Sequence, residues 1–359
     1  MILHSFSYFS RAARSWVPAL SRAIQVPRAQ SSRHTRAGHP KSHFELVSWN
    51  IDFASSQPSK RCLGLVDHIL NSGTPDIICL QEVRLDVRAS LLGNAEIRES
   101  FLVTDAEPDL EERRFSTMTL LLKKRFTYNT STDKPGDRAK FSIGPVFRQS
   151  LPSATGRDGL YVCLIPPYAL DTFFGIINVH LESRDAYSYR AQQLHQLTNS
   201  LHEPGCSGGL IAGDFNATTE KDDSLIEANG LQDAWLSLHG DKEPNAPTWS
   251  VGRRRDPRYE PSRLDKIAML GLAAERMEVM HPGSIGLASG EGGEVEWSDH
   301  RLDKISCRIW PPPARSLSAL GLTNLSKLTL YHEKEGLGLP VLQLFYHSKA
   351  VHLGEPAHQ

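Results

Sequence analysis

The sequence lacks long apolar runs, paired cysteines and internal repeats. No stretch of the 359 residues approaches the ~18 consecutive apolar residues that a membrane-crossing helix needs, and we expect no membrane partner. The five cysteines form no Cys-x-x-Cys pair and lie mostly in apolar runs, which argues against a zinc or disulfide framework and favours reduced thiols of an intracellular protein. The absence of a repeat excludes a solenoid.

No strong net charge is present either, but the charges are unevenly distributed. The chain has 40 basic and 41 acidic residues, yet residues 1–44 carry seven Lys or Arg and no acid. Residues 45–314 carry 29 basic and 38 acidic residues, a net charge of −9. This argues against binding nucleic acid through a broad basic surface. Any phosphate chemistry must therefore be local, and a divalent cation readily reverses the sign of an acidic pocket.

Both ends of the chain are expected to lie outside the main fold. Residues 1–44 have arginines among serines and apolar residues, which is typical of an organellar transit peptide, with a basic tail as the other interpretation. The expected location is mitochondrial or nuclear. After Trp310, three prolines end the regular pattern, and residues 311–359 are interpreted as an appendage of unknown role.

From Glu45 onward, short β-rich apolar runs alternate with helical stretches, which predicts an α/β domain. Helices are expected over Lys60 to Asn71 and Asp185 to His202, each with an apolar stripe on one side. The expected strands are Leu46 to Ile51, Asp76 to Leu80, Thr117 to Leu122, Leu160 to Ile165, Thr172 to Leu181, Gly209 to Ala212 and Lys266 to Leu270.

Several apolar runs end abruptly in residues that can hold a metal or a phosphate. The ends of neighbouring strands lie side by side in an α/β sheet, so such residues would converge on one rim. A single carboxylate after a strand is equally well explained as a helix cap, but five such endings favour a site. The endings are Asn50 with Asp52, Gln81 with Glu82, His180 with Glu182 and Ser183, Asp214 with Asn216 and Thr218, and Asp299 with His300.

Carboxylates held together at such a rim would repel one another unless a cation neutralised them. Oxygen ligands without an excess of Cys or His favour Mg²⁺ or Mn²⁺ over zinc. Hydrolysis of a phosphodiester needs a nucleophile and neutralisation of the non-bridging oxygens, which a poised carboxylate and a metal supply. The carboxylates concerned are Glu82, Asp52, Asp214 and Asp299.

Six segments, in order, resemble the motifs of the endonuclease/exonuclease/phosphatase family over about Glu45 to Trp310. The resemblance implies a four-layer sandwich of two mixed β-sheets flanked by helices. It also implies a Mg²⁺-dependent phosphodiesterase with its site at one edge. The segments are SWNID at 48–52, LQEV at 80–83, HLES at 180–183, GDFN at 213–216, RLDKI at 263–267 and SDH at 298–300.

The resemblance implies that a first group of residues from these segments holds the metal and activates water. Glu82 would be the principal metal ligand, with Asn50, Asp52 and Asp299 in or near the metal shell. Asp214 would orient and deprotonate the attacking water, which Asn216 would help to position.

A second group would act on the substrate. By resemblance, His300 would hydrogen-bond the phosphate with its ring fixed by Asp265, although Asp265 is also readable as a salt-bridged core carboxylate. His180 and Ser183 would contact the same phosphate. Trp249 would shape the DNA side of the groove, and Trp49 is expected in the core, with the groove floor as the alternative.

The WNID and HLES forms, together with Thr248 and Trp249, are most similar to the tyrosyl-DNA phosphodiesterase branch. This implies hydrolysis of 5′-phosphotyrosyl-DNA bonds in DNA repair, by a monomer that binds DNA carrying a 5′-protein or tyrosyl adduct. A tyrosyl phenolate, with a pKa of about 10, leaves without a dedicated acid.

One departure weakens this substrate assignment. The arginine that follows GDxN in the animal enzymes is absent, and Thr218 stands in its place. Arg61, Arg157 and Arg184 are candidates for a replacement charge, and Arg253 to Arg255 for contact with DNA phosphate. The alternatives are a same-fold nuclease, a deadenylase, a lipid or inositol phosphatase and, more remotely, a non-catalytic scaffold.

Overall fold

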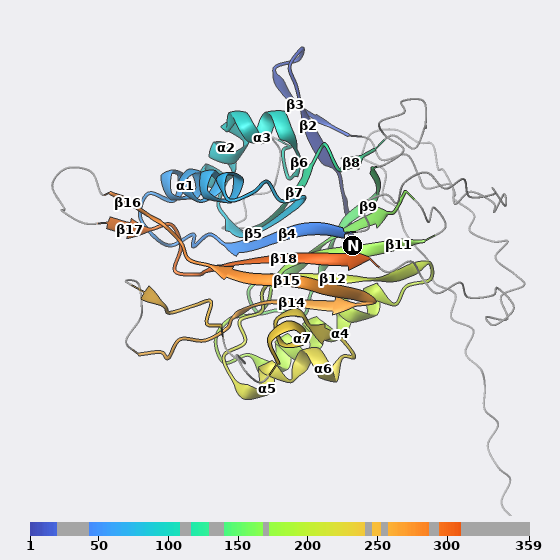
Figure 1. Ribbon diagram of the computed structural model, residues 1–359, viewed down its shortest axis with the longest axis vertical. Coiled ribbons are helices and arrows are strands. Elements are labelled where there is room, and N and C mark those ends of the chain that lie inside the picture. Colours follow the sequence, from blue (N-terminus) through green and yellow to red (C-terminus); the bar gives the residue numbers. More distant parts are fainter. Residues whose placement is uncertain are drawn as a thin grey trace, which may run out of the picture. The chain divides into compact units, whose positions relative to one another are not determined.

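The computed structural model describes residues 1–19, 43–107, 116–128, 140–167, 172–240, 246–252, 258–286 and 294–309. Two mixed eight-stranded sheets pack face to face, and helices cover the outer face of each (Figure 1). This four-layer α/β sandwich confirms the predicted fold class. No helix of these ranges is long and apolar enough to span a membrane.

The first sheet has the strand order β1-β9-β10-β11-β12-β14-β13, with β8 paired to β9. Its outer face packs on α4 (Tyr187–Leu201) through Leu194, Leu197 and Leu201. Its strands are β1 (Ile2–His4), β8 (Phe126–Thr127), β9 (Phe141–Ser150), β10 (Asp158–Ile165), β11 (Phe173–His180), β12 (Cys206–Asp214), β13 (Gln232–Asp233) and β14 (Asp265–Leu270), and the short helices on this side are α5 (Glu220–Asp223), α6 (Leu225–Ala228) and α7 (Ala234–His239).

The second sheet has the order β15-β18-β4-β5-β7-β6-β2-β3. Its outer face packs on α1 (Pro58–Asn71), whose Leu65, Val66 and Ile69 are buried. Its strands are β2 (Phe6–Ser10), β3 (Ser15–Pro18), β4 (His43–Asn50), β5 (Ile77–Val83), β6 (Phe101–Thr104), β7 (Ser116–Leu122), β15 (Leu272–Met280) and β18 (Leu302–Ile309), with α2 (Leu85–Gly93) and α3 (Ala95–Ser100) beside α1 and a separate hairpin of β16 (Ser284–Gly286) and β17 (Glu294–Glu296).

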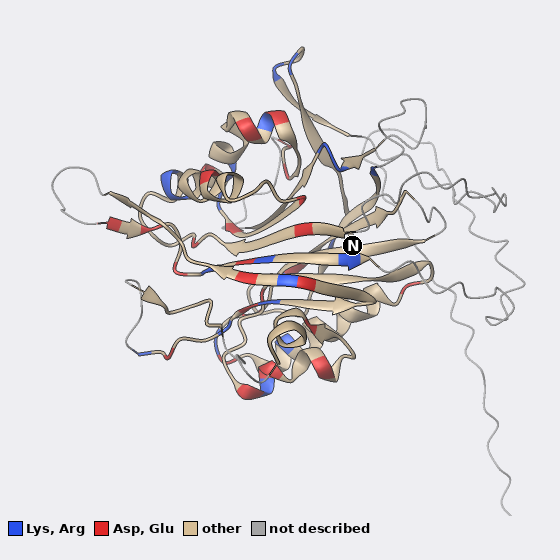
Figure 2. Ribbon diagram, in the orientation of Figure 1, with Lys and Arg blue, Asp and Glu red and all other residues tan. Residues whose placement is uncertain are grey.

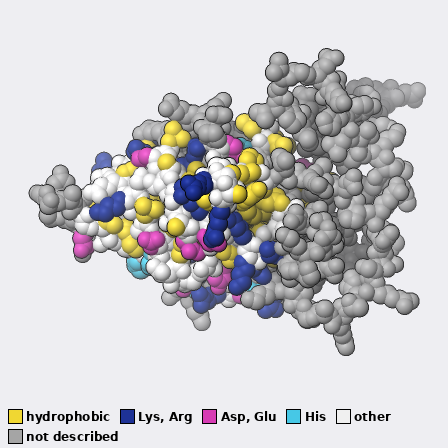
Figure 3. Space-filling view, turned by 90° about the horizontal axis from the view of Figure 1, so that it is seen from above, with side chains coloured by type: hydrophobic (Ala, Val, Ile, Leu, Met, Phe, Trp, Pro, Cys, Tyr) yellow, Lys and Arg dark blue, Asp and Glu magenta, His cyan; other side chains and the backbone are white. Residues whose placement is uncertain are grey.

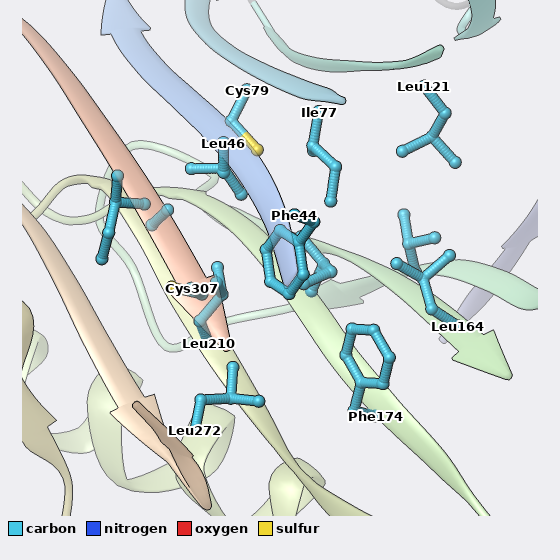
Figure 4. Packing of buried hydrophobic residues seen from close by; sticks show 14 of the residues in the cluster. Phe44, Leu46, Ile77, Cys79, Leu121, Leu164, Phe174, Leu210, Leu272 and Cys307 are labelled. Atoms are coloured by element: carbon cyan, nitrogen blue, oxygen red, sulfur yellow. The ribbon is translucent and has the colours of Figure 1, made fainter. Parts of the chain in front are cut away.

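The main core lies between the two sheets. Phe44 and Leu46 of β4 point into it, whereas Val47 and Trp49 point toward α1, as the two-residue period of a strand requires. Phe44 stacks on Phe174 of β11 with ring centroids 5.8 Å apart (Figure 4). Each such side chain contributes about 1.5–3 kcal/mol by leaving water. This packing fixes the distance between the sheets and therefore between the residues at their ends.

Every helix and strand expected from the sequence is present within a few residues of its predicted bounds. The strands that were not expected include β9, β15 and β18. In β18 the charges of Asp303, Lys304 and Arg308 obscure the alternation of its buried residues. Acidic and basic residues elsewhere lie together on the outer helices (Figure 2). All five cysteines are free thiols, as expected.

Residues 1–19 belong to the fold, and the expectation that they lie outside it is wrong. β1 pairs with β9 of the first sheet, and β2 pairs with β6 of the second. Phe6 is fully buried in the main core. Composition gave a different impression because Arg11 and Arg14 occupy the exposed turn between β2 and β3. Residues 20–42 and the C-terminal segment 310–359 lie outside the described residues.

The β2–β3 hairpin is docked on the neighbouring helices. Trp16 Nε1 donates to the carbonyl of Leu92 at 3.1 Å, and the Arg98 guanidinium lies 4.6 Å from the centroid of the Phe9 ring. Figure 3, which views the molecule from above, shows Lys and Arg side chains beside apolar ones on one face. Removal of residues 1–19 would take strands from both sheets.

We therefore expect Phe6→Ala to lower the free energy of unfolding by about 3–5 kcal/mol, because it leaves a cavity in the main core. Urea unfolding of the purified chain measures the change. Tyr8→Ala on the same strand is the control, since Tyr8 is 40% exposed, and it should cost less than about 1 kcal/mol. Equal effects of the two substitutions would contradict the placement of Phe6.

Candidate active site

In the first sheet, strand register brings three predicted residues into one row. β11 and β12 are parallel and pair His180 with Asp214. β12 and β14 are antiparallel and pair Asp214 with Asp265. All three side chains are buried. Residues 85 positions apart in the sequence thus lie in one row at one rim of the sheet. The strand endings predicted this for His180 and Asp214, whereas Asp265 was implied only by the family resemblance.

In the second sheet, the corresponding rim carries Asn50 and Glu82. β4 and β5 are parallel, and Asn50 pairs with Gln81, immediately before Glu82. Glu82 has φ 61°, a left-handed conformation that few residues other than glycine adopt. Strained residues of this kind are common at functional sites, where the surrounding structure holds them in place.

The two rims meet at the carboxylate of Asp214. Asn50 Nδ2 donates to Asp214 Oδ2 at 2.9 Å across the two sheets. His180 Nε2 lies 3.4 Å from the same oxygen and 3.9 Å from Glu82 Oε1. His300 Nε2 lies 3.9 Å from Asp214 Oδ2. The structure therefore gathers these five side chains in one cluster.

The turn after β12 fixes the second oxygen of Asp214. The backbone N–H of Asn216 donates to Asp214 Oδ1 at 2.8 Å, and the Asn216 side-chain amide donates to the carbonyl of Leu181 at 3.1 Å. Gly213 has φ 145°, and a Cβ there would lie 2.0 Å from the carbonyl oxygen of Val179. Only glycine fits at this position. The GDxN segment is thus a rigid support for one carboxylate.

The loop that carries His300 is tied to the end of β4. Ser298 Oγ donates to the carbonyl of Asn50 at 2.6 Å, and Trp49 Nε1 donates to the carbonyl of His300 at 3.0 Å. Trp49 is fully buried, so its expected core position is confirmed. His300 Nδ1 lies 2.8 Å from Asp265 Oδ2, the contact expected of an orienting residue.

The two histidines of the cluster differ in charge. Burial, reinforced by the charge of Arg157, lowers the pKa of His180 well below its usual value. Burial also disfavours the charged form of His300, but the adjacent Asp265 carboxylate outweighs it and raises the pKa of His300 well above the usual value. Near neutral pH, His180 is therefore neutral and His300 is an imidazolium.

The surroundings of Glu82 fit a divalent cation. Burial raises the pKa of Glu82 to about 7, although the N–H of Phe53 donates to Oε2 at 2.8 Å. A bound cation would restore the charged carboxylate. Asp214, Asp265 and His300 also place one potential ligand atom each within 4.8 Å of one another, but the ring nitrogen Nδ1 of His300 is occupied by Asp265. The oxygen donors of Glu82 and Asn50 suit Mg²⁺ or Mn²⁺.

Asp299 and Trp249 lie together at the edge of the cluster. Trp249 Nε1 donates to Asp299 Oδ2 at 3.1 Å, and Asp299 Oδ1 lies 4.0 Å from His300 Nε2. The half-exposed ring of Tyr259 lies 5.3 Å from the Trp249 ring. This aromatic pair borders the site. The predicted Arg253 to Arg255 triplet lies outside the described residues.

Asp52 and Ser183 are less directly placed. The Asp52 carboxylate accepts from the N–H of Ala54 at 3.1 Å and lies 3.7 Å from Arg61 Nη1. Arg61 is fully buried and donates to the carbonyls of Ser56 at 2.8 Å and of Asp52 at 2.6 Å. Asp52 and Arg61 therefore brace the loop after β4. Ser183 follows β11 at the same rim, and the metal role of Asp52 and the phosphate role of Ser183 stay predictions.

Two arginines contribute more than the sequence indicated. Arg157 is only 8% exposed and interacts electrostatically with Asp214, Glu182 and Glu82, so it is the candidate replacement charge that lies at the site. Arg190 is buried and pairs with Asp222 at 2.7 and 2.9 Å while donating to the carbonyl of Glu182. These contacts hold the segment after β11 in place. Because α4 itself contains no acidic residue, the sequence did not indicate that Arg190 forms an ion pair.

A family model for the endonuclease/exonuclease/phosphatase family matches residues 47–300. The chain belongs to this family. Its members are metal-dependent phosphoesterases, and the chain is an enzyme of this class. No match was found among curated protein sequences.

Solved structures share the fold. The structure of D. rerio TDP2 complexed with single strand DNA product is 20% identical, covers 75% of this chain and 100% of that chain, and has a TM-score of 0.55. TDP2 from C. elegans is 18% identical over 74% and 75%, with a TM-score of 0.54. A family protein from Bacteroides thetaiotaomicron is 14% identical over 75% and 98%, with a TM-score of 0.53.

Because Glu82 must lose its proton to bind a cation, we expect the affinity for Mn²⁺ to rise with pH up to about 7 and to level off above it. Below that pH the affinity should fall roughly tenfold per pH unit. Isothermal titration calorimetry measures it. Glu82→Gln should abolish uptake, whereas Glu227→Gln on the exposed face of α6 should not. An affinity independent of pH from about 5 to 8 would refute this assignment.

Proposed function

We propose that the enzyme is a Mg²⁺-dependent phosphodiesterase that hydrolyses 5′-phosphotyrosyl-DNA bonds, the reaction of tyrosyl-DNA phosphodiesterase 2 (TDP2). The observation that carries the proposal is the Asp214 carboxylate, held by Asn50 and Asn216 beside one neutral and one charged histidine. The motif forms of the tyrosyl-DNA phosphodiesterase branch support this substrate. A structure of the same fold with a single-strand DNA product supports DNA as the polymer.

The residues divide the chemistry among themselves. Asp214 has both oxygens fixed by hydrogen bonds, so its remaining lone pairs orient a water and accept its proton. The His300 imidazolium, held by Asp265, neutralises a non-bridging oxygen as charge develops, and His180 contacts the same phosphate. A divalent ion on Glu82 and Asn50, with Asp299 nearby, would supply further charge neutralisation.

The rim of the site suits a single strand. Trp249 and Tyr259 present aromatic faces next to Asp299, and aromatic side chains stack on unpaired bases without regard to sequence. Arg157, inside the site, provides the positive charge that Thr218 cannot provide. An acidic surface with positive charge confined to the site favours recognition of a strand end over recognition of a long duplex.

The wild-type enzyme with Mg²⁺ should release tyrosine from a 5′-phosphotyrosyl oligonucleotide. Asp214→Asn should lower kcat by roughly 100- to 10,000-fold, because it removes the base. Asp185→Asn, on the exposed turn before α4, should leave kcat unchanged. Abasic DNA, poly(A) and an inositol phosphate belong in the same assay. Faster turnover of any of these compounds than of the tyrosyl oligonucleotide would overturn the proposed substrate assignment.

Arg157 should provide the positive charge that the substrate phosphate meets. We expect Arg157→Gln to reduce kcat/KM about 10- to 100-fold, as loss of one charged hydrogen bond of roughly 1.5–3 kcal/mol predicts. Arg157→Lys should recover part of the loss. Arg184→Gln is the control, since Arg184 is an exposed arginine in the segment that follows β11. Equal kcat/KM values for the two glutamine variants would exclude the role of Arg157.

A further inference from the structure

Asp303 is a carboxyl group buried on the strand that carries apolar core residues. It is 1% exposed on β18, and Ile305 and Cys307, which follow on the same face, belong to the main core. Strand pairing places it opposite Ser48, two residues inward from Asn50, so it lies one row deeper than the active site. Neither oxygen of Asp303 has a hydrogen-bond partner among the described residues. A buried polar group without a partner destabilises the fold and requires an explanation.

Other polar atoms close by are also unsatisfied. Asp265 Oδ1 and Arg263 Nε are buried without a hydrogen-bond partner in the described part of the chain. Asp303 interacts electrostatically with Asp265, Arg263, Asp233 and Lys266, and β14, which begins at Asp265, contacts β18, which carries Asp303. Asp265 Oδ2 is engaged by His300 Nδ1 at 2.8 Å, and the Thr248 side chain also hydrogen-bonds the Asp265 carboxylate. Asp265 Oδ1 is still without a donor in the described part of the chain.

The environment of Asp303 favours its protonated form. Burial raises its pKa well above the usual value, and the Asp265 carboxylate acts in the same direction. Arg263 and Lys266 oppose this shift, but Arg263 is paired with Asp233 at 2.7 Å and Lys266 with Asp223 at 2.7 Å. Near neutral pH, Asp303 is a neutral acid, which can donate a hydrogen bond as well as accept one.

We propose that Asp303 is a positioning residue for the Asp265–His300 pair, and that its carboxyl group supplies the hydrogen bond that Asp265 lacks at Oδ1. A carboxylate held at both oxygens cannot turn away from its histidine, so the His300 ring keeps its direction toward the phosphate. The inference rests on the proposed role of His300. It assigns a function to a residue that would otherwise only weaken the fold.

The arrangement has a stability cost with a defined sign. The pKa of Asp303 is raised in the folded chain above its unfolded value of about 4, so folding takes up a proton there and stability falls as pH rises above about 4. An apolar residue at this position has no such penalty. The neighbours that titrate or carry charge are Asp265, Asp233, Arg263 and Lys266.

The test compares Asp303→Leu and Asp303→Asn with Cys307→Val, a control on the same face of the same strand. We expect Leu to lower kcat by about 10- to 100-fold with KM little changed, as loss of an outer hydrogen bond does. Asn retains a donor of the same shape and should stay within about threefold of wild type. The control should match wild type in kcat.

A second readout is independent of any substrate. The proton on His300 Nδ1 gives a downfield NMR signal that reports its bond to Asp265, and it should shift in the Leu variant but not in the Asn variant. If Leu leaves both kcat and this signal at wild-type values, Asp303 has no positioning role. If the Leu variant does not fold, kcat and the NMR signal of Asp303→Val are measured in its place. A shifted signal in an enzyme that fails to release tyrosine would support this inference and overturn the substrate alone.

Discussion

Of the hydrogen bonds that cross from one sheet to the other, the site depends on the one from Asn50 Nδ2 to Asp214 Oδ2 at 2.9 Å. Its length is set by the core below it, where Phe44 of one sheet stacks on Phe174 of the other. Strand register then decides which residues stand beside it. Because packed sheets deform little, the reactive groups are held in position before a substrate arrives.

Electrostatics give this rigid cluster its chemistry. One imidazole is kept neutral by burial and the other charged by a buried carboxylate, within a few ångströms of the same aspartate. Glu82 is buried enough that its proton is lost only near neutral pH. Environments that drive similar groups to different protonation states mark a site where proton transfer and charge stabilisation are divided between residues.

The sequence predicted the part of the site that lies at the ends of apolar strands, since Asn50, Glu82, His180 and Asp214 each interrupt a clear hydrophobic run. The contact of Asp265 with His300 followed only from the family resemblance, because nothing local links residues 35 positions apart. β1 and β2 were missed because their pairing partners in the main fold lie about 90 to 150 residues away, and β3 pairs only with β2. A charge in a strand suggests a surface position, so the burial of Asp303 gave no signal.

The central claim is that Glu82 and Asn50 hold a divalent ion beside Asp214, between the ends of the two sheets. Anomalous diffraction from crystals soaked in Mn²⁺ tests it most directly. The account predicts one strong peak in contact with the Glu82 carboxylate and close to Asn50 and Asp299. A peak bound elsewhere, with the Glu82 carboxylate left uncoordinated, would contradict it.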